Sequence, residues 1–252
     1  MAAHPNPSQL NNICIWQQNL NTSHITQLTL TNTLLPSDWD IIALQKPAIN
    51  KIGNTRANMH WRVVYPTAKY TDRTRSRAVT LINLSISTNT WQQIDFSSTD
   101  VVVVQLLTLQ GYCMIFNTYN NCKHNNTISV IEQFMSEHIA TVHPNQQDHM
   151  VWLGDFNHHH LLWDKSSNSH LFTTPTLTTS QKLIDLLADY RLTQILPRNK
   201  PTLQSLSSKN WTRPDNTFCT EHTCNVLVSC DTNPDRHGPN TDHPSLHSLT
   251  CP

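Results

Sequence analysis

Short apolar runs separated by polar turns fill most of the chain, a pattern that predicts many short strands. Some runs, such as Ile41–Leu44, are wholly apolar, which indicates strands that are buried on both faces. We expect strands at Ile13–Leu20, Ile41–Leu44, Trp61–Tyr65, Ala78–Leu84, Val101–Leu109, Tyr112–Asn117, Met150–Leu153, Gln194–Leu196, Asn210–Phe218, Val226–Ser229 and Ser245–Leu249.

Three segments have helical periodicity instead. Ser23 is placed to cap a helix that reaches Leu35, where Pro36 stops it. The other two helices are marked by one-sided apolar positions: Ile128, Ile131, Phe134, Met135 and His138 or Ile139 in one, and Leu183, Ile184, Leu187 and Ala188 in the next. Strands therefore outnumber helices, and we expect an α/β domain over residues 11–250, as a mixed sheet or two stacked sheets with helices outside. Residues 1–10 are expected to form a disordered N-terminal tail.

Composition removes several classes of protein. The chain has 252 residues and is 37% hydrophobic, enough for a sizeable core, but no apolar run is long enough to cross a membrane. With only four glycines, a dinucleotide or P-loop site is not expected, so we predict no small organic cofactor. The polar start lacks a signal peptide, which predicts an intracellular protein, nuclear or cytoplasmic, that is not secreted and has no membrane partner.

Charge and cysteine content give less direction. Seventeen basic and seventeen acidic residues balance, so a nucleic-acid partner would need a local cationic groove. The seven cysteines suit free thiols in a reducing compartment. Cys219, Cys224, Cys230 and His222 could be zinc ligands, although partly buried cysteines in a strand pair are the favoured interpretation.

Candidate chemistry lies where strands end. Asp155 and Asn157 follow the apolar run Met150–Leu153, and an acid and an amide two residues apart project the same way from extended backbone. They suit a hydrolase that holds a metal-associated water and a phosphate oxygen, or equally an Asx turn at a strand end. Asp242 next to His243 could form an acid and imidazole pair.

Two further groups are ambiguous. A basic cluster precedes the strand at Ala78 and could face substrate phosphates, or it could be an ordinary solvated loop; its members are Lys69, Arg73, Arg75 and Arg77. His158, His159 and His160 cannot all converge on one ion, because neighbouring side chains on extended backbone point to opposite sides.

Six motifs together carry a resemblance that spans about residues 11 to 250. They are Trp16–Asn21, Ile42–Gln45, Phe116–Asn120, Trp152–Trp163, Trp211–Asn216 and Thr241–His243. In this order they resemble the endonuclease/exonuclease/phosphatase superfamily, and more closely the apurinic-type endonuclease domain of fungal non-LTR retrotransposons. The resemblance implies a four-layer α/β sandwich of the deoxyribonuclease I type, with two packed mixed sheets flanked by helices.

The same resemblance implies Mg²⁺-dependent (or Mn²⁺-dependent) cleavage of a DNA phosphodiester, with a reverse transcriptase encoded by the parent element as a further partner. It gives Asp155 the attacking water, Asn157 a phosphate oxygen and Tyr119 the phosphate or leaving group. It also gives His243 the scissile phosphate, with Asp242 orienting it. Asn19 and Asp242 are assigned to the metal, and Asn21, Thr202 and Asp215 to substrate binding and the surroundings of the histidine.

One residue departs from the family motif. After Leu44 and Gln45 the family has a Glu that is its principal metal ligand, whereas this chain has Lys46. At about 4 Å and an effective dielectric of about 20, a unit charge pair is worth roughly 4 kcal/mol, so replacing an acid by an ammonium costs several kcal/mol of metal affinity. We therefore expect either a DNA endonuclease with weakened activity or a catalytically inactive nucleic-acid-binding remnant.

Two routes could preserve activity. Lys46 could neutralise the phosphate itself, or an acid among Asp155, Asp215 and Asp242 could recruit the ion to a shifted position. Hydrolysis of a sugar phosphate or inositol phosphate, found in the same superfamily, is disfavoured because Trp163 and the Trp211–Pro214 segment resemble the retroelement branch.

Overall fold

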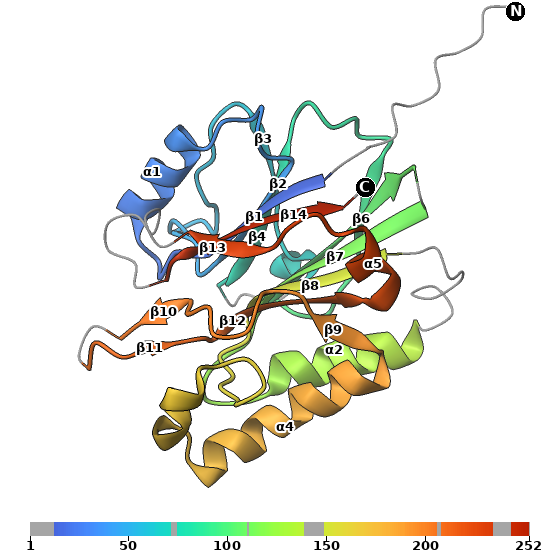
Figure 1. Ribbon diagram of the computed structural model, residues 1–252. Coiled ribbons are helices and arrows are strands. Elements are labelled where there is room, and N and C mark those ends of the chain that lie inside the picture. Colours follow the sequence, from blue (N-terminus) through green and yellow to red (C-terminus); the bar gives the residue numbers. More distant parts are fainter. Residues whose placement is uncertain are drawn as a thin grey trace, which may run out of the picture.

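Two six-stranded sheets form the centre of the computed structural model, which describes residues 13–71, 75–109, 111–138, 149–205, 208–233 and 243–251 (Figure 1). The first sheet has the order β13 (Asp231–Asn233), β14 (Ser245–Cys251), β1 (Ile13–Asn19), β2 (Ile41–Gln45), β4 (Ala78–Asn83) and β3 (Trp61–Val64). The second has the order β5 (Trp91–Ile94), β6 (Val101–Thr108), β7 (Gly111–Tyr119), β8 (His149–Asp155), β12 (Asp215–Thr220) and β9 (Leu192–Gln194).

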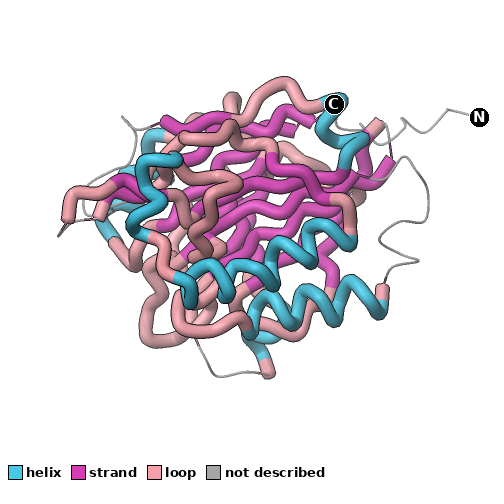
Figure 2. Tube along the Cα trace, turned by 60° about the horizontal axis from the view of Figure 1, so that its bottom comes forward, coloured by secondary structure: helices cyan, strands magenta, loops and turns pink. Residues whose placement is uncertain are grey.

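Helices cover the outer faces of both sheets. Helix α1 (His24–Thr33) lies on the first sheet, while α2 (Asn126–Glu137) and α4 (Thr174–Asp189) lie across the second. Figure 2 shows the two long helices in front of the strands of the second sheet. The shorter elements are the 3-10 helices η1 (Thr67–Tyr70) and η2 (Ser166–Leu171), helix α5 (Glu221–Val226) and the hairpin β10 (Leu203–Gln204) to β11 (Trp211–Thr212). The four-layer α/β sandwich predicted from the sequence is confirmed.

Three apolar clusters explain why so many strands have no polar face. One fills the space between the sheets, including Ile15, Val104 and Val151, and the other two lie under the helices. Because central strands are covered on both sides, β2, β4 and β8 are buried along their whole length. The uninterrupted apolar runs in the sequence have this cause.

Both sheets are mixed, and their parallel pairs decide where the strand ends meet. Strands β1 and β2 run parallel with Asn19 opposite Gln45, and β7 and β8 run parallel with Tyr119 opposite Asp155. The other named strand pairs are antiparallel, including β12 with β8, which places Asp215 opposite Asp155. Polar residues from the carboxyl ends of four strands therefore gather at one edge of the sandwich.

Most predicted elements are confirmed with shifts of one or two residues at their ends, and α1 begins at the predicted cap, with Ser23 Oγ accepting from the Thr26 amide at 3.1 Å. The predicted strand Val226–Ser229 is wrong, because helix α5 occupies 221–226 and extended chain without strand pairing follows. The acidic Glu221 in its first turn favours a helix there.

The predicted strand Asn210–Phe218 is also corrected, since it is two strands, β11 and β12. Between them lie Arg213, whose guanidinium donates to the carbonyls of Leu196 and Pro197, and Pro214, which has no amide to donate. Strand β5 was not predicted, because its Trp91–Ile94 segment has two central glutamines. The proposed N-terminal tail 1–10 and Ile139 lie outside the described residues.

No helix in the described part of the chain combines the length and the apolar character that crossing a lipid bilayer requires.

Gly154 in β8 gives a direct test of sheet packing. It has a φ of +140°, and a Cβ at this position would lie 1.9 Å from the Thr118 carbonyl oxygen of the neighbouring strand. We expect Gly154→Ala to lower the free energy of unfolding by at least about 3 kcal/mol, measured by urea denaturation, because the obstructing atom is backbone.

Gly53→Ala is the matched control, because Gly53 also has a positive φ, of +82°, but its nearest atom is the flexible Lys69 side chain at 3.5 Å. It should cost only about 1 kcal/mol. Equal losses for the two variants would contradict this account of the β7 to β8 contact.

Candidate active site

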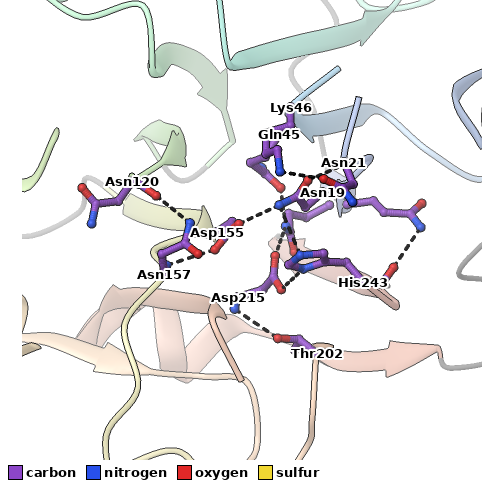
Figure 3. A network of polar contacts seen from close by, with 12 residues as sticks. Asn19, Asn21, Gln45, Lys46, Asn120, Asp155, Asn157, Thr202, Asp215 and His243 are labelled. Atoms are coloured by element: carbon purple, nitrogen blue, oxygen red, sulfur yellow. Dashed lines mark hydrogen bonds and ion pairs between the residues drawn. The ribbon is translucent and has the colours of Figure 1, made fainter. Parts of the chain in front are cut away.

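The candidate site lies where the two sheets meet at the edge described above. Asn19 ends β1, Asp155 ends β8, Asp215 begins β12, and His243 lies two residues before β14. Figure 3 shows these four side chains pointing toward one another, with Lys46 and Asn21 beside Asn19. Residues separated by up to 224 positions in sequence thus share one network of hydrogen bonds.

Asp215 orients the imidazole. Its Oδ2 atom lies 2.8 Å from His243 Nδ1, and its Oδ1 atom accepts from Gln17 Nε2 at 3.2 Å. Its backbone amide donates to Thr202 Oγ1 at 3.0 Å. Asp215 and Thr202 therefore lie next to the histidine, and their roles stay predictions, whereas Asp242 lies outside the described residues.

Asp155 is the buried carboxylate at the centre of the network, only 2% exposed. Its Oδ2 accepts from Asn19 Nδ2 at 2.6 Å, and the same amide nitrogen lies 3.4 Å from His243 Nε2. Burial raises the pKa of Asp155, and so does the neighbouring carboxylate of Asp215, while His243 and the hydrogen bonds oppose the shift. This carboxyl group consequently binds a proton more readily than an exposed aspartate does.

The segment after β8 forms the Asx turn that the sequence left open. The Asn157 amide donates to Asp155 Oδ1 at 3.0 Å, and Asn157 has a left-handed φ of +51°. Asn157 Nδ2 donates to the Asn120 carbonyl at 2.6 Å, which fixes the side chain at the edge of the network. The turn and the site are thus compatible, since the turn holds Asp155 and Asn157 on one side.

Lys46 leaves β2 on a strained backbone. Its φ is +44°, its amide donates to the Arg77 carbonyl at 2.7 Å, and its carbonyl accepts from the Thr22 amide at 2.8 Å. Its Nζ donates to Asn21 Oδ1 at 2.6 Å. The ammonium therefore lies beside Asn21, and the backbone amide of Asn21 donates to Asn19 Oδ1 at 2.9 Å.

The arginines of the basic cluster are placed differently from one another. Arg77 makes two hydrogen bonds to the Asp100 carboxylate and lies over the Tyr119 ring, 5.0 Å from its centre. Arg75 donates to the Ile49 carbonyl at 3.0 Å from an exposed position. Arg73 lies outside the described residues. The charge of Arg77 is thus balanced by an acid, so contact of this cluster with phosphates stays a prediction.

Tyr119 is nearly buried beside the network. Burial raises the pKa of its phenol to about 12, with a further contribution from the Asp155 charge. Its hydroxyl therefore stays protonated at neutral pH and is available as a donor.

The acids and the imidazole fit a divalent cation by donor type. Asp155, Asp215 and His243 have ligand atoms that all lie within 4.8 Å of one another. No other set of three His, Cys, Asp or Glu side chains does so among the described residues. Carboxylate oxygens suit Mg²⁺ and Mn²⁺, and an imidazole nitrogen is a common additional ligand for transition metals. Position 46 adds no donor oxygen and instead brings a positive charge to the same edge.

The zinc interpretation of the cysteines has no support in the described residues. Cys219 and Cys224 have their sulfurs 3.1 Å apart, but they form no group of three ligands with His222 or Cys230. The three consecutive histidines also have different surroundings. His158 is buried, His159 Nδ1 lies 3.6 Å from Asp164 Oδ2, and the His160 ring packs against the Trp163 ring.

Several residues of the network were not assigned a role from the sequence. Gln17 bridges to Asp215 and Gln45, and Gln45 donates to Asn117 Oδ1 at 2.6 Å, so buried amides link the two sheets below the site. Asn120 holds Asn157 through its carbonyl. In the sequence, such residues can be recognised as polar side chains at strand positions where both faces of the strand are expected to be buried.

Comparison with known proteins agrees with this geometry. Residues 113–247, more than half of the chain, match the family described as endonuclease-reverse transcriptase. The chain belongs to this family, and its predicted resemblance to retrotransposon endonucleases of the endonuclease/exonuclease/phosphatase superfamily is confirmed. No curated protein matches the sequence.

Solved structures share the fold at low sequence identity. The endonuclease domain of TRAS1, a telomere-specific non-LTR retrotransposon, is 17% identical with a TM-score of 0.69, and the match covers 94% of this chain and 98% of that one. AP endonuclease LMAP from Leishmania major is 10% identical with a TM-score of 0.73, covering 98% and 90%. The 3'-5' exonuclease NExo from Neisseria meningitidis is 15% identical with a TM-score of 0.68, covering 94% and 99%.

His158 predicts how stability responds to pH. Burial lowers the pKa of its imidazole from 6.5 to about 4, so the unfolded chain binds this proton more readily than the folded chain does. Above pH 6.5 this group does not lower the free energy of unfolding. As the pH falls from 6.5 toward about 4, the free energy of unfolding decreases by on the order of 3 kcal/mol because of this group.

Chemical denaturation across this pH range should show a shallower loss for His158→Gln than for the native chain. If both proteins lose the same free energy of unfolding between pH 6.5 and about 4, His158 is not the titrating group.

Proposed function

We propose that the chain is a divalent-metal-dependent phosphodiesterase that nicks DNA, and that Lys46 weakens its activity. The observation that carries the proposal is the convergence of Asn19, Asp155, Asp215 and His243 in one buried network at the sheet edge. Membership of the endonuclease-reverse transcriptase family supports a hydrolase lineage and DNA as the substrate. A reverse transcriptase partner, a nuclear or cytoplasmic location and a fungal origin stay predictions.

The residues of the network divide the reaction between them. Asp155, whose pKa is raised by burial, accepts the proton of the attacking water. Asp215 holds His243 through Nδ1, which leaves Nε2 facing the phosphate. Asn157 has a second amide hydrogen for a phosphate oxygen, and Tyr119 donates a proton to the leaving oxygen. The water oxygen forms a bond to phosphorus while the bond from phosphorus to the leaving O3′ breaks, which gives a 5′-phosphate on one side and a 3′-hydroxyl on the other.

A divalent cation held by Asp155 and Asp215, with Mg²⁺ or Mn²⁺ as the candidates, would neutralise charge on the phosphate. Asn19 and His243 are the other polar groups next to this position. Lys46 replaces the acid that the family motif has at this strand end, so a cation bound here would have one ligand fewer and a like charge nearby.

The second candidate function is binding of nucleic acid without turnover. It is favoured specifically by Lys46, because an ammonium attracts phosphate while it opposes a divalent cation. The two functions differ in one measurable respect, since the second requires no strand cleavage under any metal condition.

A nicking assay on supercoiled plasmid tests the proposal. With Mn²⁺ or Mg²⁺ we expect slow nicking by the native chain and an increase of at least about tenfold for Lys46→Glu, because the restored acid contributes metal affinity.

Asp155→Asn in the Lys46→Glu background is the control, and it should reduce the rate by about a hundredfold or more, because the substitution removes both the proton acceptor and a negatively charged cation ligand without a change of shape. Equal rates for the native chain and Lys46→Glu would contradict the role given to Lys46. Absence of nicking by both, with DNA still bound, would favour the second function.

A further inference from the structure

Lys46 brings a positive charge to the edge of the network, next to Asn21. No carboxylate of the described residues forms an ion pair with Lys46 Nζ, whereas Arg77, which directly precedes β4, is paired with Asp100. Lys69, the other nearby lysine, donates to Asn54 and lies over the Tyr65 ring. Lys46 thus combines an ammonium that has no ion pair in the described part of the chain with hydrogen bonds that lead through Asn21 to Asn19.

The position of this ammonium is fixed from both ends. The Lys46 backbone is held by hydrogen bonds to Arg77 and Thr22, and Nζ is held by Asn21 Oδ1 at 2.6 Å. Asn21 is itself held in place, because its backbone amide donates to Asn19 Oδ1 at 2.9 Å. A side chain that is already ordered loses less entropy when it binds a ligand than a free surface lysine does.

The donors that Lys46 has left suit an anion. An ammonium carries three N–H donors and no acceptor, and Asn21 uses one of them among the described residues. Asn19, which bonds to Asp155 and lies near His243 Nε2, connects this ammonium to the candidate catalytic groups (Figure 3). An anion that contacts Lys46 would thus lie at the rim of the site itself.

We propose that Lys46 and Asn21 form a phosphate-binding site that holds a backbone phosphate of DNA without a divalent cation. The ammonium contributes the positive charge and two N–H donors to the non-bridging oxygens, and Asn21 keeps it directed toward the network. This inference rests on the proposed function for the identity of the ligand as DNA, but it does not depend on whether the strand is cut.

The expected ligand is a phosphodiester within a strand, because Lys46 lies at the edge where four strand ends meet and because the matching family is described as endonuclease-reverse transcriptase. An ion pair with a hydrogen bond to phosphate is stronger than a neutral contact. Its loss should therefore be measurable in affinity even when several other contacts remain.

The test is fluorescence anisotropy of a short labelled DNA duplex with the full chain in excess EDTA. Lys46→Met keeps the length of the side chain and removes its charge, and it should weaken binding by about tenfold. Because one phosphate contact is lost, the slope of log affinity against log salt should fall by about one. Lys46→Arg keeps the charge and should bind within about threefold of the native chain.

Two controls separate this effect from folding and from total charge. Lys46→Asn removes the charge and suits the left-handed backbone, so it should weaken binding as Lys46→Met does even if the methionine variant folds poorly. Lys182→Met removes one positive charge from helix α4, where Lys182 pairs with Glu132, and should leave both affinity and salt slope unchanged.

The proposal is supported if the native chain binds the duplex in EDTA more tightly than Lys46→Met and Lys46→Asn do. The proposal is overturned if those variants match Lys182→Met in affinity and salt slope, or if the native chain shows no binding in EDTA. Failure of every variant to nick plasmid would count against the proposed function only, since this comparison needs no turnover.

Discussion

Two carboxylates are buried next to each other at the edge of the sandwich, and this arrangement constrains everything around them. Asp155 and Asp215 are register partners on neighbouring antiparallel strands, and both are at most 2% exposed. Buried acids of like charge are costly unless donors or cations surround them. Asn19, Gln17 and His243 provide the donors, and the pKa of Asp155 is still raised by burial and by its neighbour. Buried carboxylates of this kind attract positive charge, so the proposed function depends on which cation binds next to them.

The scaffold supports this arrangement through the meeting of strand ends. Parallel pairing of β1 with β2 and of β7 with β8 brings their carboxyl ends to one edge, and Gly154 permits the close approach of β7 to β8. Below the site, Gln45 and Asn117 link the two sheets through side-chain amides. Because buried amides must be paired, this link favours one relative position of the sheets over others.

Apolar runs predicted stacked sheets with helices outside, and polar residues at strand ends indicated candidate site residues, because both are local signals; the roles given to those residues stay predictions. Asp155, Asn157 and Asn19 could be placed at strand ends, but their mutual contacts depend on pairing between strands far apart in the chain. The contact of Gln17 with Asp215 was not predictable, because it joins two sheets across 198 positions. Helix α5 was missed because Val226–Val228 is apolar and short, and such runs do not distinguish helix from strand.

The central claim is that the charge at position 46 sets how tightly the site binds a divalent cation. Calorimetric titration of Mn²⁺ into the native chain and into Lys46→Glu tests this claim most directly. The account predicts binding that is at least about a hundredfold weaker for the native chain, because a ligand is lost and a like charge is gained. Equal affinity of the two proteins for Mn²⁺ would contradict it.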